Sequence, residues 1–301
     1  MRISAVLRGG LAAMACVLAT VTQLQGQAPG YEFFDGTGGN AADAPIVMVL
    51  HGAMGSGPQV RRSSGFDDWA KAAGVVAVYP SGAGRLWNDG RFAANARRQD
   101  LAARDDVGGL IALVRALEAQ GLGDADRLYV IGHSNGGGMA MRLACDRPDA
   151  IRGIAVVATK VLKDVPCAHG DVPVPAVFFY GTADELNPHA GRSDATSRRD
   201  RNLGYSWSAE ESLAIWARRN GCAARGATQG IDGTDDGVSV TRWDWTGCAA
   251  QLRYFETAGG GHAWPGVPLR RVMLLDRGVP EVAVTDINAG QETLRFFFGM
   301  D

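Results

Sequence analysis

Ser134 lies in the glycine-rich stretch YVIGHSNGGGMA, at 129–140, and its surroundings could support nucleophilic catalysis. An apolar run precedes it, a helical pattern follows it, and glycines stand two positions before and two positions after it. At a strand–serine–helix junction, such small neighbours permit a sharp turn that lifts the hydroxyl above the sheet. The chain has 41 glycines in 301 residues, so an ordinary turn serine is the alternative. Catalysis requires that suitable partners occur further along the chain.

A serine hydroxyl at neutral pH needs a base to take its proton and an acid to orient that base. In this architecture the chain order is Ser, then Asp or Glu, then His. Asp184 ends the apolar run VFFYGTAD, and His262 follows an apolar run and a glycine triplet in GGGHAWPG. Both therefore lie on loops at the carboxyl end of the expected sheet, where ligands collect. We predict that Ser134 is the nucleophile, His262 the base and Asp184 the orienting acid.

The other histidines and acids are interpreted as structural or surface residues. His169 lies in a loop with cysteine and proline and His189 in a polar stretch, so both are expected in solvent. His51 and His133 precede or adjoin the serine, and we expect them to orient the backbone. Four acids in or beside a polar, glycine-rich segment are expected in surface turns: Asp232, Asp235, Asp236 and Asp244.

The negative charge that develops on a substrate carbonyl oxygen needs preset N–H donors. The stretch HGAMGSG, at 51–57, follows the first clear apolar run, where one of these donors usually originates. The backbone N–H groups of Ala53 and of Asn135, directly after the serine, are the predicted pair. An ordinary glycine turn is the alternative for 51–57.

The elements that must position these residues alternate between strands and helices. Short apolar runs predict buried strands at 45–52, 74–82, 126–134, 153–159, 175–184 and 251–262. Periodic apolar residues and capping signals predict helices at 105–121, 136–146, 208–221 and 285–298. This alternation predicts an α/β fold with a mostly parallel sheet covered by helices on both faces. Two stretches interrupt it, a polar loop at 185–207 and a Pro- and Gly-containing insert at 265–284, and such loops are often lids or binding loops.

Residues 1–26 have the layout of a secretory signal peptide. Arg2 and Arg8 precede an apolar run at 11–21 that ends in a polar, small-residue exit, with cleavage expected near Gly26. The run is far shorter than the about 20 apolar residues that span a bilayer. We therefore expect a secreted protein without a membrane span. A buried amphipathic N-terminal helix is the alternative.

The charge balance excludes a basic nucleic-acid-binding surface. The formal charge is −2, and removal of 1–26 takes away two arginines and no acid, which gives −4. Binding to nucleic acid requires a clustered excess of Lys and Arg, which is absent here. The remaining residues, 27–301, suit one large α/β domain.

Four cysteines remain after residue 26, which is typical of two disulfides in an exported protein. Three pairings are possible, and proximity in sequence favours Cys145–Cys167 and Cys222–Cys248. Four buried free thiols are the alternative. A zinc site is not expected, because no Cys-x-x-Cys or His-x₃-His spacing occurs.

The motifs together resemble one family of secreted esterases, which groups polyhydroxybutyrate depolymerases with feruloyl and acetylxylan esterases. The resemblance covers about residues 45–298 and rests on VLHGAMGSG, YPSGAGRLWNDG, RDDVGGLIALV, DRLYVIGHSNGGGMAMRLACDRPD, FYGTADELNP, RRNGC and GGGHAWPG, in that order. It implies an α/β-hydrolase fold, hydrolysis of carboxylic esters, and neither cofactor nor metal. By motif position it assigns the nucleophile to Ser134, the acid to Asp184 and the base to His262.

The resemblance also implies residues that contact substrate. LWND resembles a Trp-Asn segment that faces the substrate, so Trp87 and Asn88 are candidates, together with Trp264 of GGGHAWPG. A core tryptophan beside a turn asparagine is the alternative. The chain departs from the family at Ala53, where relatives often have cysteine, in its short front end before Pro45, and in the two inserts.

The sequence therefore predicts a secreted serine esterase that acts through an acyl-enzyme. Phenolic or acyl esters of plant polysaccharide are the favoured substrates, and a short-chain polyester or its oligomers are the alternative. A serine peptidase would use the same three residues, but it usually carries a propeller or a large cap domain for which this chain leaves little room. A non-catalytic binding protein usually lacks one of the three.

Overall fold

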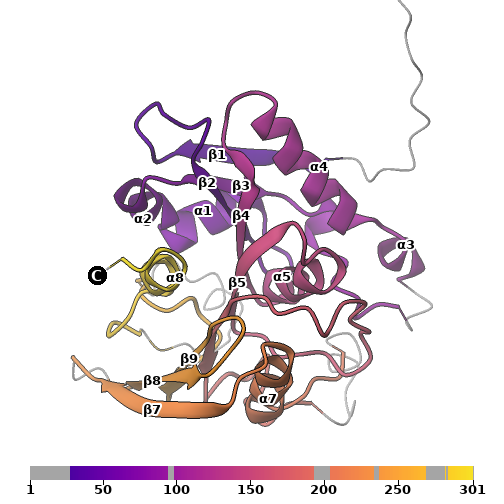
Figure 1. Cartoon of the computed structure of the whole chain (residues 1–301). Helices are drawn as coiled ribbons and strands as arrows, with labels where there is room; N and C mark the ends of the chain where they lie inside the picture. The colour runs from indigo at the N-terminus through magenta and orange to yellow at the C-terminus, as the bar shows by residue number, and fades with distance from the viewer. Residues whose placement is uncertain are drawn as a thin grey trace, which may run out of the picture.

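The computed structural model describes residues 28–93, 98–192, 204–233, 237–268, 282 and 284–300. The strands of this part form one nine-stranded sheet in the order β1-β3-β2-β4-β5-β6-β9-β8-β7 (Figure 1). The six strands from β3 to β9 in this order run parallel to one another, and antiparallel strands are added at both edges. The mostly parallel α/β architecture predicted from the sequence is confirmed.

The six buried strands predicted from apolar runs are all present. They are β2 (Pro45–Leu50), β3 (Val76–Pro80), β4 (Asp124–His133), β5 (Ile151–Val157), β6 (Ala176–Gly181) and β9 (Leu252–Ala258). Every residue of β2, β3 and β6 is buried. A parallel strand covered on both faces needs apolar side chains on both, which explains the continuous apolar runs.

Helices cover both faces of the sheet (Figure 1). One face carries α4 (Asp106–Glu118), α5 (Asn135–Asp146) and α7 (Ala209–Arg219), whose apolar residues belong to one core cluster. The other face carries α1 (Gly57–Ser64), α2 (Phe66–Ala73) and α8 (Ala289–Phe298), which belong to a second cluster. The connection from β3 to α4 contains a 3₁₀ turn, η1 (Ala83–Arg85), and the short α3 (Gln99–Ala102).

Side-chain caps fix where the predicted helices begin. Asp105 caps α4, and Ser208 with Glu211 forms the predicted capping box of α7. The last helix begins at Ala289, four residues after the predicted start at 285. The reason is Asn288, whose side chain accepts two backbone N–H groups of the first turn and so caps the helix there.

Three antiparallel strands and the helices α1, α2 and α3 are absent from the sequence prediction. The strands are β1 (Tyr31–Asp35), β7 (Ala224–Ile231) and β8 (Ser239–Thr246). The expectation that Asp244 lies in a surface turn is wrong. It lies within β8, opposite Arg253 of β9, whose Nε donates to its carboxylate at 2.6 Å. Asp244 therefore forms an ion pair between two neighbouring strands and does not lie in a turn.

Both predicted disulfides are present. Cys145, in the last turn of α5, is bonded to Cys167, and Cys222, after α7, is bonded to Cys248, after β8. Each bond ties the end of a helix to a neighbouring loop. The proximity pairing is therefore the correct one of the three possible pairings.

The first insert folds back against the body of the protein where the structure describes it. Arg192 and Ser206 form an isolated β-bridge, and both are buried, as is Asn187. Several predictions fall outside the described residues: the signal peptide at 1–26, the segment 193–203 of the first insert, and 269–281 and 283 of the second.

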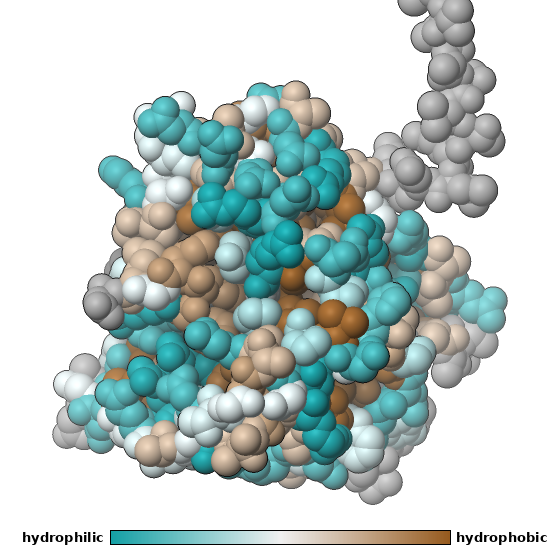
Figure 2. Space-filling view, viewed as in Figure 1, coloured by the Kyte–Doolittle hydropathy of each residue, from teal (hydrophilic) through white to brown (hydrophobic). Residues whose placement is uncertain are grey.

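Polar and apolar side chains alternate over the surface in Figure 2. Teal and white residues spread over most of this face, and brown residues occupy small areas between them. Within the described ranges, no helix has both the length and the apolar character needed to cross a bilayer.

Candidate active site

Ser134 occupies the sharp turn between β4 and α5. Its backbone has φ 53° and ψ −117°, a left-handed conformation that is strained for any residue with a Cβ. Its N–H donates to the Val157 carbonyl of β5 at 2.8 Å, which anchors the turn to the sheet. A Cβ added to Gly132 would lie 2.1 Å from the Gly136 carbonyl oxygen, so both flanking glycines are required for the turn to close. These are the features of a nucleophile elbow.

Asp184 and His262 lie together, although 78 residues separate them in the sequence. His262 Nδ1 donates to Asp184 Oδ2 at 2.8 Å, and each residue is only 3% exposed. The other carboxylate oxygen accepts the N–H groups of Leu186 at 2.9 Å and Asn187 at 2.8 Å. Both carboxylate oxygens of Asp184 thus accept hydrogen bonds. These bonds fix the orientation of the carboxylate and, through it, that of the His262 ring.

The glycine triplet before His262 makes this approach possible. The Ala183 N–H donates to the Gly260 carbonyl at 2.9 Å, so the loop after β9 lies against the loop after β6. A Cβ on Gly181 would lie 2.2 Å from the same carbonyl oxygen. Small residues on both loops therefore bring the histidine within reach of the aspartate.

The charge state of Asp184 follows from its surroundings. Burial alone would raise the pKa of its carboxyl, but the charge and hydrogen bond of His262 act against burial. The ammonium of Lys160 and the N–H of Asn187 add to that effect, and the net pKa lies below the ordinary value. The carboxylate is therefore ionised at neutral pH, as the orienting acid of such a pair must be.

His133 joins the elbow to the loop of His262. Because a carbonyl can only accept, His133 Nε2 donates to the His262 carbonyl, at 2.7 Å, and the two rings lie 4.9 Å apart. Burial, and then the neighbouring His262, lower the pKa of His133 to about 4, so its ring is neutral. His133 therefore holds the backbone of the His262 loop, the backbone-orienting role that the sequence predicts.

His51 holds backbone in the same way. Its Nε2 accepts the N–H of Gly82 at 2.9 Å, and its Nδ1 donates to the Gly52 carbonyl at 2.7 Å. Burial lowers the pKa of His51, which keeps this neutral tautomer. The predicted backbone-orienting role of His51 is therefore confirmed.

The segment 51–55 passes directly beside the elbow. A Cβ added to Gly52 would lie 3.4 Å from Cβ of Ser134. The next residue, Ala53, is exposed, and Met54 has a positive φ of 63°. The Asn135 N–H is one of the first N–H groups of α5, which have no acceptor within the helix. The two predicted oxyanion donors therefore belong to segments that adjoin at the turn of Ser134.

Trp87 and Asn88 contact the protein itself, which is the alternative that the sequence left open. Trp87 is 1% exposed, and its Nε1 donates to the His51 carbonyl at 3.0 Å. Asn88 is equally buried, and its amide donates to the carbonyls of Ala102 at 2.9 Å and Arg104 at 2.8 Å. Both side chains are used in holding neighbouring loops.

Trp264 is also buried. It is 6% exposed, belongs to the core cluster under α8, and its ring lies 6.4 Å from that of His133. All three candidate substrate-binding residues thus pack inside the protein. Substrate contact by them would need a rearrangement, so none of them is proposed below as a substrate-binding residue.

The side chain of Asn135 has a structural role that the sequence did not reveal. Its amide oxygen accepts the Trp87 N–H at 2.8 Å, and its amide nitrogen donates to the Trp87 carbonyl and to Asp89 Oδ2. Asp89 is held in turn by a buried ion pair with Arg91, with N–O distances down to 2.6 Å. The signal for this network is Trp87 and Asp89 in LWND, a segment in which the resemblance assigned Trp87 and Asn88 to substrate contact.

The remaining histidines differ from expectation in one case. His169 is exposed, as predicted. His189 is half-buried, and its Nε2 lies 3.1 Å from both the Tyr254 hydroxyl and the Glu256 carboxylate. The expectation of a solvated surface histidine is therefore wrong for His189, because β9 supplies polar partners on the face that this residue covers.

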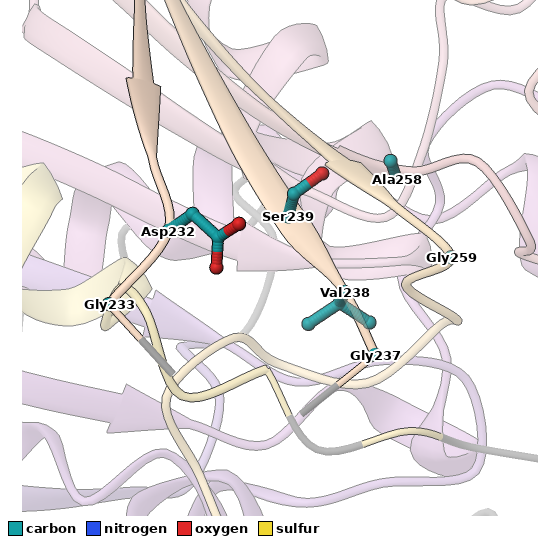
Figure 3. A pocket seen from close by; sticks show the side chains of 7 residues that line it. All are labelled: Asp232, Gly233, Gly237, Val238, Ser239, Ala258 and Gly259. Atoms are coloured by element: carbon teal, nitrogen blue, oxygen red, sulfur yellow. The ribbon is translucent and has the colours of Figure 1, made fainter. Parts of the chain in front are cut away.

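A separate hollow lies where β8 begins and β9 ends (Figure 3). It is lined by Asp232, Gly233, Gly237, Val238, Ser239, Ala258 and Gly259. None of the predicted site residues lines it. No group of three His, Cys, Asp or Glu side chains in the described part of the chain could hold a metal ion.

Proteins of known sequence that resemble this chain include esterases. NocK of Nocardia uniformis subsp. tsuyamanensis, which is assigned as an esterase, is 32% identical over 230 residues, covering 74% of this chain and 66% of that protein. A probable feruloyl esterase C of Aspergillus terreus is 25% identical over 225 residues, covering 73% and 71%. The poly(3-hydroxybutyrate) depolymerase of Ralstonia pickettii is 29% identical over 238 residues, covering 73% and 48%. The chain thus matches about two thirds of NocK and under half of the depolymerase.

Two broader comparisons address the fold. The prolyl oligopeptidase family profile matches residues 67–162, which include the elbow. The solved structure of an acetyl xylan esterase from Aspergillus awamori superposes with a TM-score of 0.50 at 15% identity, covering 78% of this chain and 89% of that one. The chain has an α/β-hydrolase fold and is similar in sequence to feruloyl esterases and to a poly(3-hydroxybutyrate) depolymerase, the group that its motifs resemble.

Proposed function

We propose that this chain is a secreted serine esterase in which Ser134, His262 and Asp184 form the catalytic triad. The observation that carries the proposal is the buried Asp184–His262 pair, whose loop is bonded through His133 to the strained elbow of Ser134. The two disulfides support an oxidising, extracellular setting. We further propose that residues 27–301 act as one domain after removal of 1–26.

The proposed reaction has two stages. His262 takes the proton of the Ser134 hydroxyl while the oxygen attacks the ester carbonyl, and Asp184 stabilises the imidazolium that forms. The N–H groups of Ala53 and Asn135 bind the oxyanion of the tetrahedral intermediate. The imidazolium then protonates the departing alcohol, which leaves an acyl-enzyme. Water, deprotonated by His262, cleaves the acyl-enzyme and frees the acid.

Phenolic or acyl esters of plant polysaccharide are the proposed substrates. The similarity to a feruloyl esterase C supports this choice, and the similarity to a poly(3-hydroxybutyrate) depolymerase supports short-chain polyester as the alternative. Both are carboxylic esters and require the same chemistry at Ser134. Substrate choice therefore depends on the loops around the elbow rather than on the triad.

The experiment that tests the proposal compares the wild-type protein with S134A. We expect wild type to hydrolyse a p-nitrophenyl short-chain ester, and S134A to lose at least about 10³-fold in kcat with unchanged circular dichroism. A fluorophosphonate probe should add its mass to the peptide that contains Ser134 in wild type only. Hydrolysis by S134A at the wild-type rate would disprove the assignment.

Substrate class is resolved by rates on methyl ferulate, acetylated xylan and 3-hydroxybutyrate oligomers, measured side by side. The highest kcat/KM is expected on methyl ferulate or acetylated xylan. A preference for the oligomers would support the polyester alternative. A proline-containing peptide p-nitroanilide should be included because of the prolyl oligopeptidase match, and faster cleavage of this amide than of every ester would overturn the esterase proposal.

A further inference from the structure

A buried lysine contacts the turn that follows Asp184, the acid of the proposed acid–base pair. Lys160, which follows β5, is 1% exposed, so its whole side chain is removed from solvent. Its Nζ donates to the Asn187 carbonyl and lies 4.9 Å from the centre of the Tyr180 ring. Burial of an ammonium costs several kcal/mol, so its presence here needs an explanation beyond packing.

One turn connects this lysine to the acid. The Asn187 N–H donates to Asp184 Oδ1 at 2.8 Å, and the Asn187 amide donates to the Ala158 carbonyl at 2.7 Å. The carbonyl of the same residue accepts from Lys160. Asn187 therefore forms hydrogen bonds to three groups: the Asp184 carboxylate, the Ala158 carbonyl after β5 and the Lys160 ammonium.

The charged groups around this turn are few. Asp184 supplies the negative charge and Arg192 a further positive one, and Tyr180 is neutral because burial raises its pKa well above the ordinary value. His133, on the other side of His262, is neutral as well. Among these groups, Lys160 is the lysine whose charge acts directly on Asp184, the acid of the pair.

We propose that Lys160 is a positioning residue for the triad: its ammonium holds the turn that carries Asp184, and its charge acts on the Asp184–His262 pair. This inference rests on the function proposed above. A positive charge beside the pair opposes the formation of a second positive charge within it, on the imidazole of His262. The same charge favours ionised Asp184.

Neutral substitutions separate the charge from the hydrogen bond. K160M removes both, whereas K160Q keeps an N–H donor for the Asn187 carbonyl. If the charge acts, the acid limb of the kcat/KM–pH profile on methyl ferulate moves to higher pH by roughly 0.5–1 unit in both variants. K163M is the matched control, because Lys163 is exposed and contacts Trp207 instead, and its profile should match that of wild type.

The wild-type profile gives a second readout that needs no substitution. Burial lowers the pKa of Lys160 to about 8, so the lysine loses its charge between about pH 7 and 9. Loss of the charge favours the imidazolium that forms in the transition state. We therefore expect a second, smaller rise in kcat/KM over this range, of about two- to fivefold, which is absent in K160M and K160Q.

The outcomes distinguish the two proposals. A flat wild-type profile from pH 7 to 9 would overturn the role of Lys160, even if neither neutral variant folds. A second result would also overturn the role of the charge. If the acid limb shifts in K160M but not in K160Q, only the hydrogen bond to the Asn187 carbonyl matters. Failure of the proposed function has another signature, which is hydrolysis by S134A or none by wild type at any pH.

Discussion

The indole N–H of Trp87 donates to the carbonyl of His51 at 3.0 Å, and the backbone of the same tryptophan holds the side chain of Asn135 on both sides. One residue therefore ties the segment that carries Ala53 to the first turn of α5. The spacing between the two proposed oxyanion donors is set by a buried tryptophan that has no need to touch substrate.

The first prediction concerns this bond. W87F keeps an aromatic ring in the core but removes the donor to His51, so the oxyanion segment should shift. We expect kcat to fall about tenfold with little change in KM, because a misplaced donor weakens binding of the transition state only. Steady-state kinetics on methyl ferulate checks this.

The control is W216F, which alters a core tryptophan of α7 that packs on Phe178. It should lower the free energy of unfolding while leaving kcat unchanged. Equal kcat in W87F and wild type would show that the tryptophan only fills the core.

The second prediction concerns the strain at Ser134. S134G removes the Cβ from a backbone with φ 53° and ψ −117°, where glycine is favoured. The variant should be inactive but about 1 kcal/mol more stable than wild type in urea unfolding. S134A, which keeps a Cβ, should be inactive without this gain. Equal stabilisation by both variants would show that loss of the hydroxyl, and not of the Cβ, is responsible.

The third prediction concerns pH and stability. Folding lowers the pKa of His133 from 6.5 to about 4, so between these values the unfolded chain binds a proton that the native protein does not. Stability is therefore fully present above pH 6.5 and falls as the pH drops toward 4, by at most about 3 kcal/mol for this residue. Urea unfolding at pH 4.5, 5.5 and 7 measures the decline.

H133Q should reduce this pH dependence, since glutamine keeps a donor for the His262 carbonyl but does not titrate. Part of the dependence should persist, because burial lowers the pKa of His51 in the same direction. An unchanged slope in H133Q would mean that other groups cause the decline.

The fourth prediction concerns the disulfides. They close loops with sequence separations of 22 and 26 residues, and removal of either by paired serine substitution should cost about 3 kcal/mol. The melting temperature should fall to a similar degree in both double variants. Dithiothreitol reduces both bonds, so it should lower the melting temperature of wild type by more than either double substitution does. Melting that is insensitive to dithiothreitol would contradict a structural role for both bonds.

The sequence predicted the parts of the fold whose burial forces an apolar pattern. The six parallel strands are covered on both faces, so each contains a run of buried, mostly apolar residues. β7 is mostly exposed, and its sequence ARGATQGI has no such pattern, so nothing in composition reveals that it pairs. In β8, Thr241, Trp243 and Trp245 alternate with charged residues, which is a pattern typical of a strand with one exposed face. The sequence prediction did not use this pattern, because the charged residues were interpreted as part of a polar segment.

The candidate site was predictable where chemistry demands particular residues in a particular order. Asp184 and His262 meet as expected because each ends a parallel strand at the same edge. Lys160 was not predictable, since a lysine after a strand is normally solvated. The structural role of Trp87 also depends on which loop its side chain contacts in the folded protein. A sequence motif does not contain that information.

The closed geometry of the elbow also limits how this protein can evolve. A side chain at position 132 would collide with the Gly136 carbonyl, and one at 136 with the Leu50 carbonyl at 2.4 Å, so neither position can vary alone or as a pair. A saturation library screened for activity should return only glycine at both. If Ser134 is the nucleophile, as proposed, changes in substrate preference are then expected at positions outside this turn.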